Sequence, residues 1–381
     1  MSDGKKKKYR SLKAMPFGGN ALRLSWKEML VVVPAALVLA LWVIPFLYGR
    51  WEQFDFDTPN FRISYDFRDD YWVYGKWAEY AADHYDVMFV GDSVIWGMYT
   101  DNDHTLSACY NARKGKPVAA NLGIDGLHPV ALEGLMRDFG GGIRNKKVYL
   151  YFNALWLDCP EFDLTALPKH EDSGEVKKSA VMHPRLVPQF DYTVYVYDEP
   201  LKQRIGNWEE RNLPFYSLQN HLRNVFYGNK PLAEWMPANP ASNPFAPIQR
   251  KVSAVETEHV NRTDAWSDGG VATFDFQWVQ LPDSRQWTAF LETVRLLQAR
   301  GNDVTVLLGA FNQHLLSDES LEGYIKLMEA AADRLDDLGI KYIEIETLPS
   351  KDYGDASHPL GSGYELIAEQ IIEEEESQNE N

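Results

Sequence analysis

Cysteine is scarce in this sequence, with only Cys109 and Cys159 among 381 residues. This excludes a small disulfide-stabilised fold, because such folds need several bridges in a short chain. We expect Cys109 near the far end of a helix and Cys159 just past a strand, and we expect no bridge between them. The chain also lacks an internal repeat, a Cys/His metal spacing and a glycine-rich loop that would cradle phosphate.

Only one long hydrophobic run is present, the nineteen uncharged residues from Leu30 to Tyr48. A helix of ~20 apolar residues spans the core of a bilayer. Residues 1–28 before the run hold eight Lys/Arg against two Asp/Glu, whereas acidic residues follow it. The positive-inside rule then predicts that the N-terminus is cytoplasmic and that the chain from residue 52 onward is extracytoplasmic.

The alternative to a membrane anchor is a cleaved signal peptide. A signal peptide ends in a cleavage site of small residues, but here the run is followed by the bulky sequence Tyr-Gly-Arg-Trp, and the basic leader is long. We therefore expect a single-pass anchor over residues 29–49, embedded in the bilayer through residues 30–48.

Positive charge is in deficit outside the leader. The formal charge is −17 in total and +6 over residues 1–28, which leaves −23 on residues 29–381. This balance disfavours a nucleic-acid partner, because phosphate backbones bind basic surfaces. A solvated acidic surface is the simplest explanation. With 45% hydrophobic and 24% charged residues, the chain has the composition of a globular protein.

From residue 85 onward, short apolar runs alternate with amphipathic stretches, which is the pattern of βαβ units. The expected strands cover residues 87–90, 118–122, 147–152, 304–308 and 342–345. The expected helices cover residues 130–139, 287–300, 321–338 and 363–376. The pattern predicts an α/β fold, a doubly wound three-layer α/β/α sandwich around a five-stranded parallel sheet.

The expected organisation places two halves of this α/β domain around a long interruption rich in Pro, Asn and aromatic residues. A loop of that length needs structure of its own, so we expect a cap on the carboxyl edge of the sheet. In chain order the predicted parts are the leader 1–28, anchor 29–49, stalk 50–84, first half 85–157, insertion 158–285, second half 286–376 and tail 377–381.

Two short motifs carry the chemistry. Gly91-Asp92-Ser93 follows the first expected strand and opens a helix, so Ser93 should lie at the carboxyl edge of the sheet near free helical N–H groups. Asp355 and His358 precede the last helix at a spacing of three, which lets the carboxylate orient the imidazole. Each motif alone also fits a turn or a helix cap, but together they fall at one sheet edge.

With these motifs the sequence resembles the SGNH hydrolase superfamily, also known as GDSL esterases and lipases, over residues 85–155 and 286–376. The resembling blocks are Gly91-Asp92-Ser93 with Gly97, Asn121-Leu-Gly123-Ile-Asp-Gly126, Tyr151-Phe-Asn153 and Asp355-Ala-Ser-His358-Pro359. The resemblance implies that Ser93 is the nucleophile, His358 the base and Asp355 its orienting partner. It also implies an oxyanion hole made by the N–H groups of Ser93 and Gly123 and the side chain of Asn153, with no metal and no cofactor.

One block departs from the family, which usually writes Gly-x-Asn-Asp where this chain has Tyr151 and Ala154 around Asn153. The alternative for Asn153 is an Asx turn that ends the strand.

Four further residues are expected to line the substrate site. These are Asp92 beside the serine, His128 after the glycine block, and Asn312 and His314 after the fourth strand. The alternative for His128, which precedes Pro129, is a role at the start of a helix. The alternative for Asn312 and His314 is a loop whose polar groups hydrogen-bond one another.

We therefore expect a membrane-anchored serine esterase or O-acyltransferase in a bacterial-type envelope. The resemblance and the topology together imply as substrate an acylated glycan or another ester of the cell envelope. They also imply, as partner, a multispanning membrane protein that donates acyl groups. The rival hypothesis is a non-catalytic glycan-binding protein that kept the fold, supported by the departures at Tyr151 and Ala154 and by the aromatic insertion.

Overall fold

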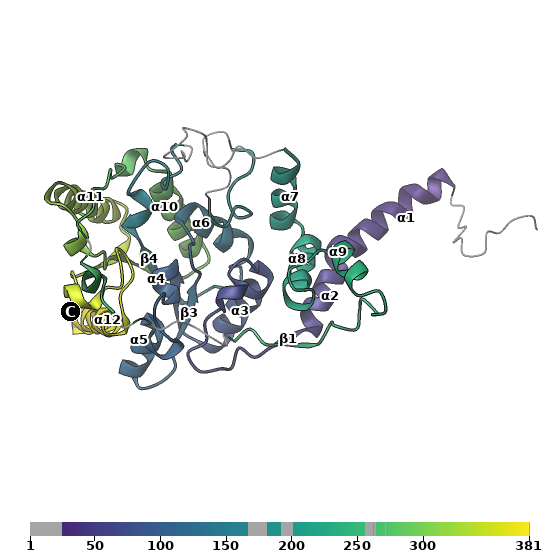
Figure 1. The fold of residues 1–381 in the computed structure, drawn as a ribbon, viewed down its shortest axis with the longest axis horizontal. Coiled ribbons are helices and arrows are strands. Elements are labelled where there is room, and N and C mark those ends of the chain that lie inside the picture. The colour runs from purple at the N-terminus through teal and green to yellow at the C-terminus, as the bar shows by residue number, and fades with distance from the viewer. Residues whose placement is uncertain are drawn as a thin grey trace, which may run out of the picture.

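A computed structural model describes residues 25–166, 181–191, 201–255, 262, 264–270 and 272–380. Residues 1–24, which belong to the basic leader, and 167–180, 192–200, 256–261, 263 and 271 of the predicted insertion lie outside the described residues, as does residue 381. The body is an α/β domain around one five-stranded parallel sheet (Figure 1). Its strands are β2 (Val87–Gly91), β3 (Ala119–Gly123), β4 (Lys147–Phe152), β6 (Asp303–Gly309) and β7 (Lys341–Ile345).

The strand order is β3-β2-β4-β6-β7, and every neighbouring pair is parallel. The predicted five-stranded sheet is thus confirmed, with strand ends within one residue of those expected. From β2 the chain first adds β3 on one side and then adds β4, β6 and β7 on the other side. The loops that follow β2 and β4 therefore diverge between these two strands. Open α/β sheets bind ligands outside the strand carboxyl ends at such a switch point.

Helices cover both faces of the sheet. Side chains of successive strand residues point to opposite sides, so each face buries its own apolar cluster under helices. Met88 and Val90 of β2 join one buried cluster, whereas Val87 and Phe89 join the other. The first face carries α3 (Tyr71–His84), α6 (Pro129–Asp138), α10 (Arg285–Ala299) and α11 (Asp318–Asp337). The second carries α4 (Ser93–Trp96), α5 (Leu106–Lys114) and α12 (Gly361–Glu380).

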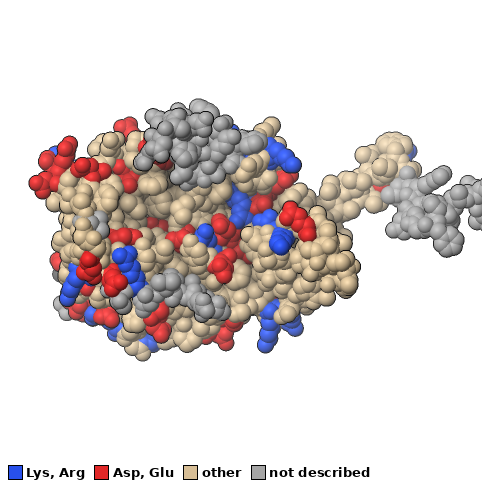
Figure 2. All heavy atoms as spheres, viewed as in Figure 1, with Lys and Arg blue, Asp and Glu red and all other residues tan. Residues whose placement is uncertain are grey.

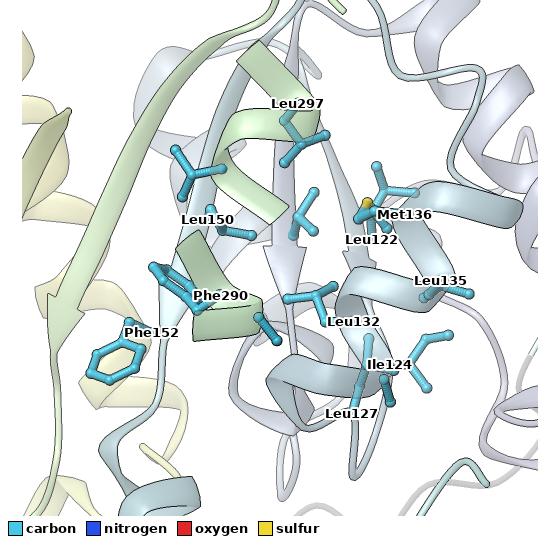
Figure 3. Packing of buried hydrophobic residues seen from close by; sticks show 14 of the residues in the cluster. Leu122, Ile124, Leu127, Leu132, Leu135, Met136, Leu150, Phe152, Phe290 and Leu297 are labelled. Atoms are coloured by element: carbon cyan, nitrogen blue, oxygen red, sulfur yellow. The ribbon is translucent and has the colours of Figure 1, made fainter. Parts of the chain in front are cut away.

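The first face is packed by branched aliphatic and aromatic side chains of α6 and α10 (Figure 3). Leu132 and Leu135 of α6 and Phe290 of α10 are almost fully buried. The ring of Phe290 lies 5.0 Å from that of Phe152 at the end of β4. This packing fixes the position of the carboxyl end of β4, which Asn153 directly follows.

The stretch predicted as a stalk, residues 50–84, contributes to the core of the domain. Its second half forms α3, and Trp77 is fully buried there with its indole N–H donating to the Asn121 carbonyl at 2.7 Å. Aromatic residues at helical spacing, such as Tyr74 and Trp77, are the signal that distinguishes this helix from a stalk. Ahead of α3, the short strand β1 (Gln53–Phe54) pairs in parallel with β5 (Lys251–Val252).

The predicted anchor is a helix from Trp26 to Trp51, long and apolar enough to cross a membrane and almost entirely exposed. It consists of α1 (Trp26–Val38), a π-helical turn over Leu39–Val43 and α2 (Ile44–Trp51). Pro45 is the second residue of α2, which begins directly after the π-helical turn. Proline has no backbone N–H to donate, which interrupts the regular helical ladder.

The described insertion differs from the predicted cap, because much of it lies away from the sheet edge. It contains α7 (Leu201–Asn212), α8 (Pro214–Phe226) and α9 (Leu232–Ala238). α8 packs against the π-helical turn, α2 and α3. In Figure 1 these three helices lie on the side of the body from which α1 emerges, opposite α11 and α12.

A buried ionic cluster holds this arrangement together. The imidazole of His221 on α8 contacts Glu52 Oε1 at 2.8 Å and Asp70 Oδ2 at 2.9 Å, and the side chains of all three are at most 1% exposed. Burial opposes the charged imidazole, but the two carboxylates outweigh it and raise the pKa of His221 to about 9. The cluster ties the end of α2, the start of α3 and the insertion to one another.

We predict that Gly123→Ala destabilises the fold. A Cβ at this position would lie 2.2 Å from Trp96 N and 2.7 Å from Ile95 C, both backbone atoms of α4. Overpacking of this kind costs about 1–3 kcal/mol, and sometimes more. Chemical denaturation monitored by circular dichroism measures the loss.

Gly206→Ala is the matched control for this change. Gly206 lies within α7 with no atom within 4 Å of an added Cβ, so alanine should stabilise the helix by roughly 0.5–1 kcal/mol. Equal unfolding free energies for Gly123→Ala and the parent chain would contradict the close approach of α4 to β3.

Candidate active site

Ser93 is placed at the carboxyl edge of the sheet by a tight turn from β2 into α4. Asp92 caps the helix, with its Oδ1 accepting from Val94 N at 3.0 Å. A Cβ at Gly91 would lie 2.6 Å from Ile95 Cγ1, so glycine is what lets α4 fold back this closely. Ser93 is the first residue of α4, and its N–H therefore has no acceptor within the helix.

The structure brings together the three predicted triad residues. His358 Nε2 lies 2.7 Å from Ser93 Oγ, and His358 Nδ1 lies 2.8 Å from both carboxylate oxygens of Asp355. The side chain of His358 is 13% exposed, so a substrate has limited access to it. Serine, imidazole and carboxylate are thus joined in a continuous chain of hydrogen bonds, the arrangement that activates a hydroxyl for nucleophilic attack.

The electrostatics of the pair favour a charged imidazole beside a charged carboxylate. Burial alone would raise the pKa of Asp355, but the hydrogen bond and charge of His358 and the N–H groups of Ser357 and His358 lower it to about 2. Burial opposes the imidazolium form of His358, but Asp355 outweighs it and raises the pKa of His358 above its ordinary value. Asp355 therefore stabilises the proton that His358 would take from Ser93.

Tyr99 completes this chain and has no signal in the sequence motifs. Its hydroxyl donates to Asp355 Oδ2 at 3.0 Å, and its ring meets His358 edge-on at 5.6 Å between centroids. Its φ of 68° is left-handed, a conformation that costs about 1–3 kcal/mol in a residue other than glycine. The guanidinium of Arg262 packs over the ring, and Arg262 N donates to Tyr99 O at 2.8 Å.

The predicted oxyanion donors are close to the serine, but two are already engaged. Gly123 N donates to Asn121 Oδ1 at 3.0 Å, so Gly123 is not the free donor that the sequence predicted. Asn153 Nδ2 donates to Asp92 Oδ2 at 2.7 Å, and Asn153 Oδ1 accepts from Leu155 N at 3.0 Å. The second contact is the Asx turn expected as the alternative, and one of the two amide hydrogens is used by Asp92.

Asp92 supports the site from beneath rather than lining it. It is 3% exposed, and its Oδ2 accepts from Asn153 Nδ2 and from the indole N–H of Trp156 at 2.9 Å. Burial raises the pKa of Asp92 against the opposing hydrogen bonds. Trp156 is another residue that the sequence motifs do not reveal. Together these contacts fix the amide of Asn153 beside the serine turn.

The other three predicted lining residues have structural contacts instead. His128 is 2% exposed; it caps α6 and contacts Met182 O at 3.0 Å, so the helix-opening alternative describes it better. Asn312 is fully buried, and its Nδ2 donates to Asp355 O at 3.0 Å, which steadies the Asp355 loop. His314 is exposed and bonds through Nε2 to Leu348 O at 3.0 Å.

A pocket of about 450 Å³ opens beside His358. Its walls are mostly apolar side chains from the far end of the insertion and from the loops after β4 and β6, with Arg262 among them. The apolar lining consists of Leu155, Trp266, Phe274, Phe276 and Leu315. Trp266, Phe274 and Phe276 of the insertion thus provide an apolar surface next to the His358 imidazole.

Neither cysteine belongs to the site, and both are free thiols. Cys109 is buried in the first half of α5 rather than near its far end, and Cys159 lies just after β4 as expected. Among the described residues, no group of three or more His, Cys, Asp or Glu side chains is arranged to hold a metal ion.

No protein-family model matches the chain, and no curated protein matches it at a significant level.

We predict that Tyr99→Phe raises the pKa of His358 further. The tyrosine hydroxyl shares the negative charge of Asp355, so its removal concentrates that charge on the imidazolium. A titration of the His358 ring followed by NMR measures the change. Tyr342→Phe is the control, since its hydroxyl bonds the exposed Asp336. An unchanged or lowered pKa in Tyr99→Phe would show that the hydroxyl does not act on the pair.

Proposed function

We propose that this chain is a membrane-anchored serine esterase or O-acyltransferase of the SGNH type, acting on ester bonds. The observation that carries the proposal is the 2.7 Å contact between Ser93 Oγ and His358 Nε2, with Asp355 at 2.8 Å on the other ring nitrogen. The four sequence blocks that resemble SGNH hydrolases support the same reaction class. Ser93, His358 and Asp355 would supply the nucleophile, the base and the group that orients the base.

In the proposed reaction Ser93 Oγ attacks the ester carbonyl while His358 Nε2 takes its proton. The tetrahedral intermediate collapses when His358 returns that proton to the departing alkoxide, which leaves an acyl group on Ser93. Water or a second hydroxyl then attacks the acyl-enzyme, with His358 again as the base. Asp355 stabilises the imidazolium in both halves of the reaction.

The negative charge on the carbonyl oxygen needs donors. The Ser93 N–H at the start of α4 and the second amide hydrogen of Asn153 are best placed to supply them, because the other hydrogen of Asn153 is held by Asp92. Gly123 would join only if its N–H left Asn121 Oδ1. The apolar pocket beside His358 supports a substrate with apolar surface next to its ester bond.

A non-catalytic binding protein is the second candidate. It is favoured by the internal hydrogen bonds that occupy Gly123 N and one hydrogen of Asn153. Against it stands the strained Tyr99, whose hydroxyl is aimed at Asp355. A site that only binds a ligand does not need a hydroxyl that fixes the position of Asp355 Oδ2.

We further propose that the helix Trp26–Trp51 anchors the catalytic domain outside the cytoplasm of a bacterial-type cell. The support is the excess of Lys and Arg before the span and of acidic residues after it. In that location the ester would be an acylated envelope glycan or a related compound. An acyl-donating membrane protein would be the partner of a transferase.

We predict that Ser93→Ala and His358→Ala each lower turnover of a simple acyl ester by about 10⁴-fold or more, because the two groups act as one unit. For the same reason the double variant should be little worse than either single variant. The parent chain should label at Ser93 with a fluorophosphonate probe. Ser377→Ala, an exposed change at the end of α12, is the control that should label like the parent.

Two results would count against this prediction. Additive losses in the double variant would argue against a shared proton chain. A parent chain that neither labels nor turns over any ester would favour the binding protein.

We predict that alkaline phosphatase fused after Asn381 is active and that a fluorescent protein fused there is dark, because the proposed topology puts the C-terminus outside the cytoplasm. Replacing the Lys5–Lys8 run with glutamate is the matched control and should reduce phosphatase activity, since the leader charge sets the orientation. Phosphatase activity that is absent in the parent and gained in the charge variant would reverse the topology.

A further inference from the structure

The insertion exposes an unusual set of large apolar side chains. Within residues 201–246 these are Leu201, Ile205, Trp208, Leu232, Met236 and Phe245, exposed by 41–74%. The stretch from Pro231 to Ala246 is almost wholly exposed and contains a single charged residue, Glu234. A chain that is 24% charged overall would place more charge on a surface in contact with water.

α9 is connected to the proposed membrane helix through α8. Its Trp235 meets the ring of Tyr227 at 5.3 Å between centroids, and Tyr227 caps the C-terminal end of α8, the helix that packs against α2. Tyr227 also donates its hydroxyl to Pro244 O, next to the exposed Phe245. The apolar surface of α9 and the Pro244–Phe245 loop therefore continues from the outer end of the membrane helix.

The depth of the α8 contact places this surface at the bilayer. α8 packs against the π-helical turn Leu39–Val43. At 1.5 Å per residue, that turn lies ~8–13 Å below Tyr48, the last residue of the uncharged run. If the run spans the apolar core, part of the insertion is already within the membrane boundary. Figure 2 shows the emerging helix as a projection with few charges beside the body.

α7 presents a second apolar face on the same side of the molecule (Figure 1). Leu201, Ile205 and Trp208 recur at the i, i+4, i+7 spacing of one helical stripe. The opposite side of α7 binds the body, where Glu210 bonds Arg185 and Arg211 bonds Asp138. A helix with one bound polar face and one exposed apolar face is typical of an element that lies in a membrane interface.

We infer that residues 201–246 form a second membrane contact, seated in the interface of the same leaflet that the outer end of the membrane helix crosses. The ligand of this surface is the lipid bilayer itself. The inference rests on the proposed membrane span and not on the proposed catalysis. A domain held at two places, with His221 joining them, keeps a fixed face toward the membrane instead of swinging on a tether.

Environment-sensitive labels in lipid nanodiscs test this contact. The full chain with Cys159→Ala and Cys109→Ala is given single cysteines by Ile205→Cys, Met236→Cys or Phe245→Cys and labelled with nitrobenzoxadiazole. Two matched positions serve as controls: Leu37→Cys within the span and Ile325→Cys on the exposed face of α11 at the far end of the body. If Cys109→Ala lowers the melting temperature, the buried Cys109 is retained.

The three insertion labels should be blue-shifted and should lose more than half their emission when the discs contain doxyl lipid, as at Leu37, whereas Ile325 should lose almost none. Insertion labels that behave like Ile325 while Leu37 is quenched would overturn the inference and leave the span intact. That result would instead favour a protein partner as the ligand of this surface. An unquenched Leu37 would overturn the span and the inference with it, and Ser93 labelling by a fluorophosphonate would still report on the catalytic proposal.

Discussion

The site depends on the close approach of α4 to the end of β3. Only a residue without a Cβ fits at Gly123, because the backbone of Ile95 and Trp96 occupies that space. Asn121 Nδ2 then reaches Ile95 O at 2.7 Å, and the buried guanidinium of Arg62 donates to Trp96 O and Gly97 O. With α4 held from both sides, Ser93 at its start has little freedom to move away from His358.

The same contact explains why the Gly123 N–H is engaged. Asn121 bonds α4 through its Nδ2 and turns its Oδ1 toward Gly123 N. One side chain thus serves the packing of α4 and occupies a donor that a reaction would use. A substrate oxyanion has to compete with a neutral amide oxygen for that donor, and a charged acceptor forms the stronger hydrogen bond. The occupied donor therefore does not by itself argue against catalysis.

The sequence predicts the structure best where one structural requirement selects one type of residue. Alternating apolar runs located all five strands, and Ser93 and His358 could be placed at one edge because carboxyl ends of parallel strands share it. α3 was not predicted because its buried face mixes aromatic residues such as Tyr74 and Trp77 with small ones such as Ala78 and lacks a leucine or isoleucine stripe. Tyr99 could not be found at all, since its left-handed backbone comes from tertiary contacts and not from a glycine in the sequence.

The insertion shows a different limit. Composition predicted a structured interruption, but the face it covers depends on one buried histidine, His221, whose partners Glu52 and Asp70 lie 169 and 151 residues earlier in the chain. Breaking such a cluster leaves buried carboxylates without a counter-charge, which is costly. The cluster therefore links the end of α2 to the start of α3 and to α8, on the same body whose sheet edge carries Ser93. The orientation of the helix Trp26–Trp51 relative to that edge is thus set by buried residues far from Ser93 and His358.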